Sequence, residues 1–276
     1  MKNKSKTIIG ISLFIVLIIF TTQAFSDECR INLNTASVLG KNEWSRDEPY
    51  LWTFGFVVDA QTFINNQFIL KIDNPGHGNL GSGVGEGYSL VIPTQTGALK
   101  KELIVPPNQE AMYCGVITLI FEEDGTPPNS AVIEAYESIA EILRVFIRDI
   151  VVPNRGIPDD LRPLKNSITA EVRRIYGAAG GFPWDFDDFI GFDYADHRIS
   201  TGEVSQNPIE LLLWSKSGDY EGAYLINGSI DVGPPLPLPP PRPPRSCPSG
   251  YTCCGATLPD GRCDSGECVK PPQLCQ

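Results

Sequence analysis

The stretch GFPWDFDDFIGFD, residues 181–193, is the part of the chain from which we begin the prediction of the fold. It interleaves five aromatic residues with four acidic ones: Phe182, Trp184, Phe186, Phe189 and Phe192 among Asp185, Asp187, Asp188 and Asp193. This pattern indicates a segment that enters a hydrophobic core while its carboxylates stay in water. Oxygen-rich loops of this kind hold hard cations. An ordinary acidic turn before a strand has the same composition, so both interpretations stand.

The N-terminus has the parts of an export signal. Three lysines lie in the first six residues, residues 8–20 are almost wholly apolar, and 24–26 supply small residues for a cleavage site. We predict a signal peptide over 1–26 with cleavage before Asp27. A retained membrane anchor is the alternative, although the apolar run is short for a span.

The size and charge of the exported chain limit its function. Removing 26 of 276 residues leaves 250, enough for one sizeable core and a small appendage. Loss of three lysines moves the net charge from −11 to −14, which disfavours binding to nucleic acid. Eight cysteines in an exported chain predict disulfides and a secreted, periplasmic or cell-surface location.

Apolar and β-branched runs predict a mainly β fold over 27–232, an antiparallel β-sandwich. The expected strands are 30–34, 51–58, 68–72, 88–93, 98–105, 113–121, 209–214 and 220–232. Cys29 and Cys114 are the only cysteines in this region. A disulfide between them is the simplest pairing, and it would fix the N-terminus onto the sandwich.

The periodicity changes to that of helices after Pro127. Apolar residues at Val132, Tyr136, Ile139 and Leu143 recur every three or four positions, with Asn129 or Ser130 as the expected cap. A second amphipathic segment starts near Asp159 and ends in glycines. We predict a two-helix hairpin inserted over about 130–177 and packed on its own sheet.

The C-terminal region differs in composition. Residues 233–245 are proline-rich and predict a stiff extended linker. Residues 246–276 are too short to form a core and predict a mini-domain stapled by disulfides. Its cysteines are Cys247, Cys253, Cys254, Cys263, Cys268 and Cys275. The vicinal pair and the absence of histidine argue against zinc, and the sequence leaves the pairing open.

Catalytic motifs are scarce. The two histidines, His77 and His197, fit no metal-ligand spacing, and we expect each in a loop without a partner. A carboxylate pair of the glycosidase type is the one catalytic alternative, using Asp185, Asp187 or Asp188 as acid and base.

Three acidic segments favour a cation instead. They precede or follow expected strands, and loops at one end of a sandwich converge. Carboxylates gathered there repel unless a divalent ion neutralises them, and calcium suits such oxygen ligands. The candidate ligands are Asp47, Glu122, Asp124, Asp185, Asp187 and Asp188. Separately solvated acids at strand ends are the alternative.

The segments GKNEWSRDEPYLWTF, ITLIFEEDG and DDFIGFD resemble the calcium-binding loops and flanking strands of C2 domains, as in protein kinase C and synaptotagmin. The resemblance implies a sandwich over about 27–232 with Asp47, Glu122, Asp124 and Asp188 as calcium ligands. Three features depart from the family: Glu48 is inserted before Pro49, glutamates replace aspartates, and the helical hairpin interrupts a short loop. The tail CPSGYTCCG resembles granulin or knottin-like cysteine modules.

These observations lead to one main hypothesis. The protein is predicted to be an exported, non-enzymatic binding module that uses calcium at a cell surface, on a lipid or on a protein partner. Phe182, Trp184 and Phe186 are candidates for insertion at that interface. A secreted hydrolase and a surface or toxin-like protein that recognises its target through the cysteine-rich tail are the alternatives.

Overall fold

A computed structural model describes most of the predicted sandwich and short pieces of the tail. The described residues are 27–41, 48–73, 75–76, 78–80, 84–103, 112–122, 129–178, 188–200, 202–214, 222–235, 252–254 and 267–269. The chain divides into two compact units, Met1–Pro234 and Pro235–Gln276. The predicted signal peptide and nearly all of the predicted linker and tail lie outside the described residues. Among the described helices, none combines the length and apolarity needed to cross a membrane.

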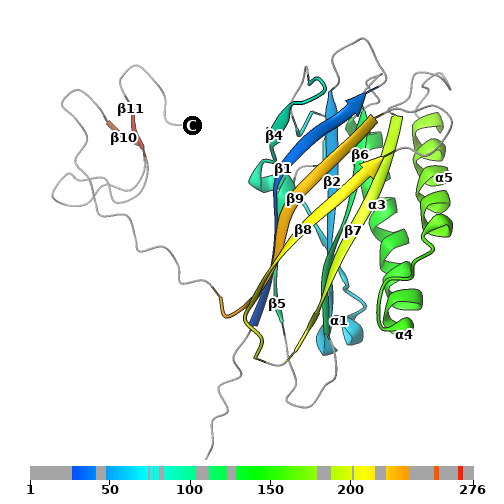
Figure 1. The fold of residues 1–276 in the computed structure, drawn as a ribbon, viewed down its shortest axis with the longest axis vertical. Helices are drawn as coiled ribbons and strands as arrows, with labels where there is room; N and C mark the ends of the chain where they lie inside the picture. The colour runs from blue at the N-terminus through cyan, green and yellow to red at the C-terminus, as the bar shows by residue number, and fades with distance from the viewer. Residues whose placement is uncertain are drawn as a thin grey trace, which may run out of the picture. The chain divides into compact units, whose positions relative to one another are not determined.

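Two antiparallel sheets form the first unit (Figure 1). One has the order β4-β1-β9-β8, with β5 also paired to β1: β4 (Ser89–Val91), β1 (Asp27–Lys41), β9 (Gly222–Gly233), β8 (Ser205–Trp214) and β5 (Ala98–Leu103). The other has the order β3-β2-β6-β7: β3 (Ile69–Lys71), β2 (Pro49–Val58), β6 (Met112–Glu122) and β7 (Asp188–Ile199). The predicted mainly β, antiparallel architecture is therefore confirmed.

The central strands β2 and β6 are buried along their whole length. A strand covered on both faces favours apolar residues at nearly every position, which explains the run in 51–58, where Thr53 is the one polar residue. One face meets the other sheet, where Ile31 and Leu99 lie against Gly55. The opposite face carries large rings, and a Cβ at Gly115 would lie 2.3 Å from the ring of Phe56. Gly115 thus makes room for that ring.

A disulfide between Cys29 of β1 and Cys114 of β6 crosses from one sheet to the other. Their Cα atoms are 6.4 Å apart and both side chains are fully buried. The predicted pairing of these two cysteines is confirmed, and it ties the first strand of the chain to the middle of the opposite sheet.

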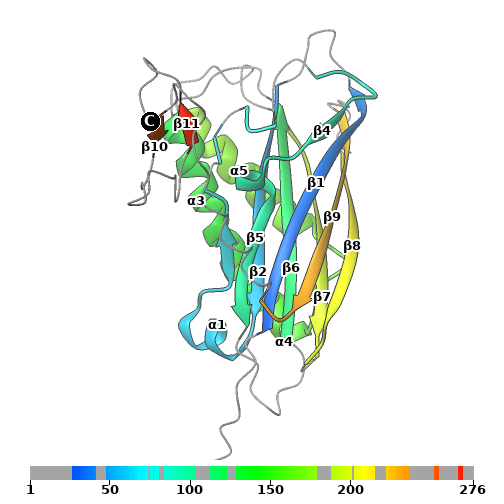
Figure 2. The same ribbon diagram turned by 90° about the vertical axis from the view of Figure 1, so that its left-hand side faces the viewer.

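The predicted helical hairpin is present between β6 and β7. It consists of α3 (Asn129–Phe146), a π-helical turn (Ile147–Val151), α4 (Val152–Asn154) and α5 (Arg162–Ala178). Figure 2 shows α3 and α5 on the side of β2 and β6 that faces away from β1 and β9. The helices are therefore a third layer, which covers the second face of the β2–β6 pair.

Tyrosines anchor this helical layer to the sheet. The ring of Tyr136 stacks on Phe54 with centroids 4.5 Å apart, and its hydroxyl donates to the Thr53 carbonyl and accepts from the Ile72 N–H. Burial raises the pKa of Tyr136, so the hydroxyl stays protonated. In α5 the hydroxyl of Tyr176 lies 3.1 Å from that of Tyr50. These contacts fix both helices over β2.

Several short elements complete the fold. The helix α1 (Ala60–Asn65) begins with a capping box between Asp59 and Thr62, a signal that our sequence analysis missed. The helix α2 (Thr94–Gly97) precedes β5. In the second unit, β10 (Thr252–Cys254) pairs with β11 (Glu267–Val269), and this register sets Cys253 opposite Cys268.

Candidate functional site

The first candidate region is the end of the sandwich at which β2 begins, β6 ends and β7 begins. The register pairs Glu122 with Pro49 on one side and with Asp188 on the other. The end of β8 lies here too, because a Cβ on Gly191 would come within 2.9 Å of the Trp214 backbone. We call this region, defined by Pro49, Glu122 and Asp188, the acidic end.

The predicted calcium ligands are only partly described. Glu122 is buried, at 2% exposure, and Asp188 is placed by its backbone register beside it. The other four, Asp47, Asp124, Asp185 and Asp187, lie outside the described residues, as do Phe182, Trp184 and Phe186. Within the described part of the chain, no three His, Cys, Asp or Glu side chains are grouped as a metal would need.

Asp193, the last acid of the opening stretch, joins the edges of the two sheets. One carboxylate oxygen accepts a hydrogen bond from the Leu212 N–H of β8 at 2.7 Å, and the other accepts from the Tyr194 N–H at 2.9 Å. The carboxylate satisfies a backbone donor on the exposed edge of β8, where a further strand would otherwise pair. Asp193 therefore has a structural role.

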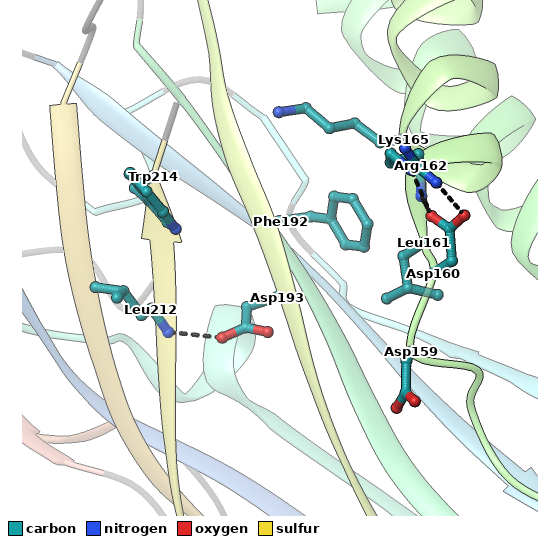
Figure 3. Close-up of a pocket in the computed structure, with 9 residues that line it drawn as sticks. All are labelled: Asp159, Asp160, Leu161, Arg162, Lys165, Phe192, Asp193, Leu212 and Trp214. Atoms are coloured by element: carbon teal, nitrogen blue, oxygen red, sulfur yellow. Dashed lines mark hydrogen bonds and ion pairs between the residues drawn. The ribbon is translucent and has the colours of Figure 1, made fainter. Parts of the chain in front are cut away.

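The second candidate region is a groove bounded by β7, β8 and the start of α5 (Figure 3). Its volume is about 670 Å³, within the range of small-ligand sites. Among the described residues, its lining consists of Asp159, Asp160, Leu161, Arg162, Lys165, Phe192, Asp193, Leu212 and Trp214. We call it the β8–α5 groove.

The charged groups of the β8–α5 groove differ in whether they are paired with other described residues. Asp160 accepts two hydrogen bonds from the Arg162 guanidinium and one from its backbone N–H, which hold the pKa of Asp160 at about 2. Lys165 has no side-chain hydrogen bond or ion pair to any described residue. Figure 3 shows its side chain extending from α5 toward β7, beside Phe192. This ammonium group is therefore available to a ligand.

A third polar cluster lies at the far end of β7, where we predicted only a loop histidine without a partner. That prediction is wrong for His197, which is in a strand, with its Nε2 atom 2.5 Å from a Glu203 carboxylate oxygen and 3.4 Å from the Ser205 hydroxyl. A catalytic relay needs the acid and the serine on different ring nitrogens. Here both contact Nε2, so these contacts have a structural role: they hold the end of β7 to the start of β8. His77 lies outside the described residues.

The β8–α5 groove was missed in the sequence analysis. Its strongest local signal is on β8. The outward positions there are Gln206, Pro208 and Glu210, followed by Leu212 and Trp214, which remain 44% and 43% exposed. Alternation in the sequence reveals those two apolar residues, but not the helix that they face. A comparison with known families and with curated proteins finds no family model and no curated protein that matches this chain.

Proposed function

We propose that the protein is an exported binding module, without catalytic activity, that uses calcium at its acidic end to contact an anionic group on a cell surface, a lipid or a protein. The observation that carries the proposal is the register of Pro49, Glu122 and Asp188. Neighbouring residues in an antiparallel sheet lie about 4.5–5.5 Å apart. The segments that continue from these three positions hold the predicted ligands.

The inserted helical hairpin is compatible with a calcium site at the acidic end. It departs from the end of β6 and returns at the start of β7, and these two strands are hydrogen-bonded neighbours up to Glu122 and Asp188. The insertion that separates this chain from C2 domains therefore leaves the two strand ends side by side. This supports the C2-like interpretation of the acidic end.

The charge at this end also favours a cation. Four connecting segments open there: 42–47, 123–128, 179–187 and 215–221. Together with Glu48 they contain nine acidic residues and two basic ones. Such an excess is destabilising when the carboxylates approach one another, and calcium relieves it with oxygen ligands. A bound ion would leave open positions for an anionic partner.

The location rests on two features. The chain begins with a signal-like segment, and the disulfide between Cys29 and Cys114 is of a kind formed in oxidising compartments. We propose that the protein acts outside the cytoplasm, as a secreted, periplasmic or surface protein. The resemblance of residues 246–276 to granulin modules supports only the proposal that disulfides hold this segment together.

Thermal unfolding of the full exported chain tests the calcium site. Calcium at about one hundred times its Kd stabilises by about 2.7 kcal/mol, and each kcal/mol raises Tm by about 2–4 °C. We expect this rise to be lost in Asp188→Asn and retained in Glu102→Gln. Glu102 is an exposed acid of β5 that pairs in register with Glu28, at the start of β1 and away from the acidic end. An unchanged Tm at millimolar calcium in the wild-type chain would refute the proposal.

A further inference from the structure

We propose that the β8–α5 groove binds a neutral oligosaccharide, independently of calcium. The inference goes beyond the function proposed for the acidic end, because it rests on other residues. The described residues that line the groove include none of the predicted calcium ligands.

One wall of the groove is an apolar platform. Leu212 and Trp214 point outward from β8 and keep nearly half of their surfaces in water, and Phe192 of β7 lies between them and α5 (Figure 3). Exposed aromatic rings beside a groove are typical of ligand contacts, and their faces suit the C–H surfaces of a sugar ring. The platform is therefore suited to a ligand that has an apolar face.

The other wall supplies hydrogen-bond donors and acceptors. Lys165 brings an ammonium group without a described partner, and Asp159 brings a carboxylate that likewise makes no hydrogen bond or ion pair with a described residue. A sugar carries hydroxyls, which donate and accept at once and can satisfy both groups. Apolar faces together with both kinds of polar group are what an oligosaccharide requires.

The charge balance argues against an ionic ligand. Asp160 is paired with Arg162, and Asp193 is held by two backbone N–H groups. Lys165 and Asp159 carry opposite charges, so the groove has little net charge to offer to a strongly anionic or cationic partner. A neutral polar ligand meets no such penalty.

The groove is also held rigidly, which lowers the entropy cost of binding. The backbones of Gly191 and Trp214 are too close for any side chain at position 191. Asp193 locks β7 to β8 at Leu212, and α5 is tied to β2 through Tyr176. A volume of about 670 Å³ accommodates several sugar rings rather than one.

The test is a titration of the full exported chain, in excess EDTA, with neutral tetrasaccharides built from glucose, mannose, galactose or N-acetylglucosamine. Tryptophan fluorescence and calorimetry report binding. We expect at least one to bind with a Kd of about 1 mM or tighter, weakened at least tenfold, about 1.4 kcal/mol, by Trp214→Ala. Trp214→Phe should restore part of the affinity, and Lys165→Met should also weaken binding. Leu39→Ala, an exposed apolar residue of β1 outside the groove, should not.

Other outcomes overturn the proposal. It fails if no tetrasaccharide binds a chain that unfolds cooperatively, or if binding is the same in Trp214→Ala and Lys165→Met. Preferential binding of sulfated dextran with strong salt dependence would make the groove an anion site instead. Asp188→Asn should leave saccharide binding intact, so failure of the calcium proposal and failure of this one are distinguishable.

Discussion

The acidic end and the β8–α5 groove share the strand β7 but differ in how their charges are balanced. At the acidic end the connecting segments carry nine acids against two bases, counting Glu48. In the groove, by contrast, Asp160 and Asp193 are already neutralised or hydrogen-bonded within the protein. We therefore propose a cation for the first region and an uncharged ligand for the second. In these two proposals the same strand contributes to two kinds of recognition.

Loss of the disulfide should affect both regions together and give the largest effect. Replacing Cys29 and Cys114 by alanine opens a cross-link between residues 85 positions apart. We expect the free energy of unfolding to fall by about 4 kcal/mol, as measured by urea denaturation. Both binding activities should decline only in proportion to the unfolded fraction. A loss below about 1 kcal/mol would mean that the packed sheets hold together without it.

Asp193→Asn should separate the two regions. The amide keeps one acceptor oxygen, so one of the Leu212 and Tyr194 N–H groups loses its partner and faces an NH₂ group. We expect a cost of about 1–3 kcal/mol in unfolding free energy and weaker saccharide binding, with the calcium-dependent rise in Tm retained. Asp159→Asn, an exposed neighbour, should change stability by less than about 0.5 kcal/mol. Equal effects of the two substitutions on the free energy of unfolding would contradict the role given to Asp193.

Glu203→Gln should give the smallest effect and leave both regions unchanged. Burial opposes ionisation of Glu203, but hydrogen bonds from the Ser200 N–H, Ser205 and His197 outweigh it and lower its pKa below 4.5. The ionised form therefore stabilises the fold above that pH, and the contribution is lost as pH falls through the lowered pKa. The variant should lose less stability than wild type on acidification. The free energy of unfolding is measured by urea denaturation at several acidic pH values. If it falls equally in the variant and in wild type, the stabilising role given to Glu203 is contradicted.

The sequence predicted most of the strands, the helical hairpin and the Cys29–Cys114 pair because each leaves a local or countable signal. The strand β7 was not among the expected strands, and β1 is longer than the expected 30–34. Continuous apolar runs mark the doubly covered β2 and β6, and three-to-four spacing marks α3 and α5. The sequence could not predict which strand edges meet. Leu161 and Trp214 are distant in the chain. They line the same groove because β7 packs beside β8, and this contact between the two sheets leaves no local signal in the sequence.

The candidate ligands show the same limit. The composition of residues 181–193 indicated acids beside rings, but it assigned Asp193 to the same group as Asp188. The register separates them: Asp188 is at the strand end, whereas Asp193 is five residues further on and is hydrogen-bonded to β8. Hydrogen bonding across sheets depends on a close approach at Gly191 that no sequence spacing encodes.

Hydrogen exchange read by mass spectrometry on the chain from Asp27 onward tests the central proposal, that the acidic end is a calcium site built from three strand ends. The account predicts that calcium, compared with chelator, slows exchange together in peptides covering 42–50, 120–128 and 183–190. Peptides covering 159–166 of the groove should not change. Absence of protection in any one of the three segments, or protection confined to the groove, would contradict it.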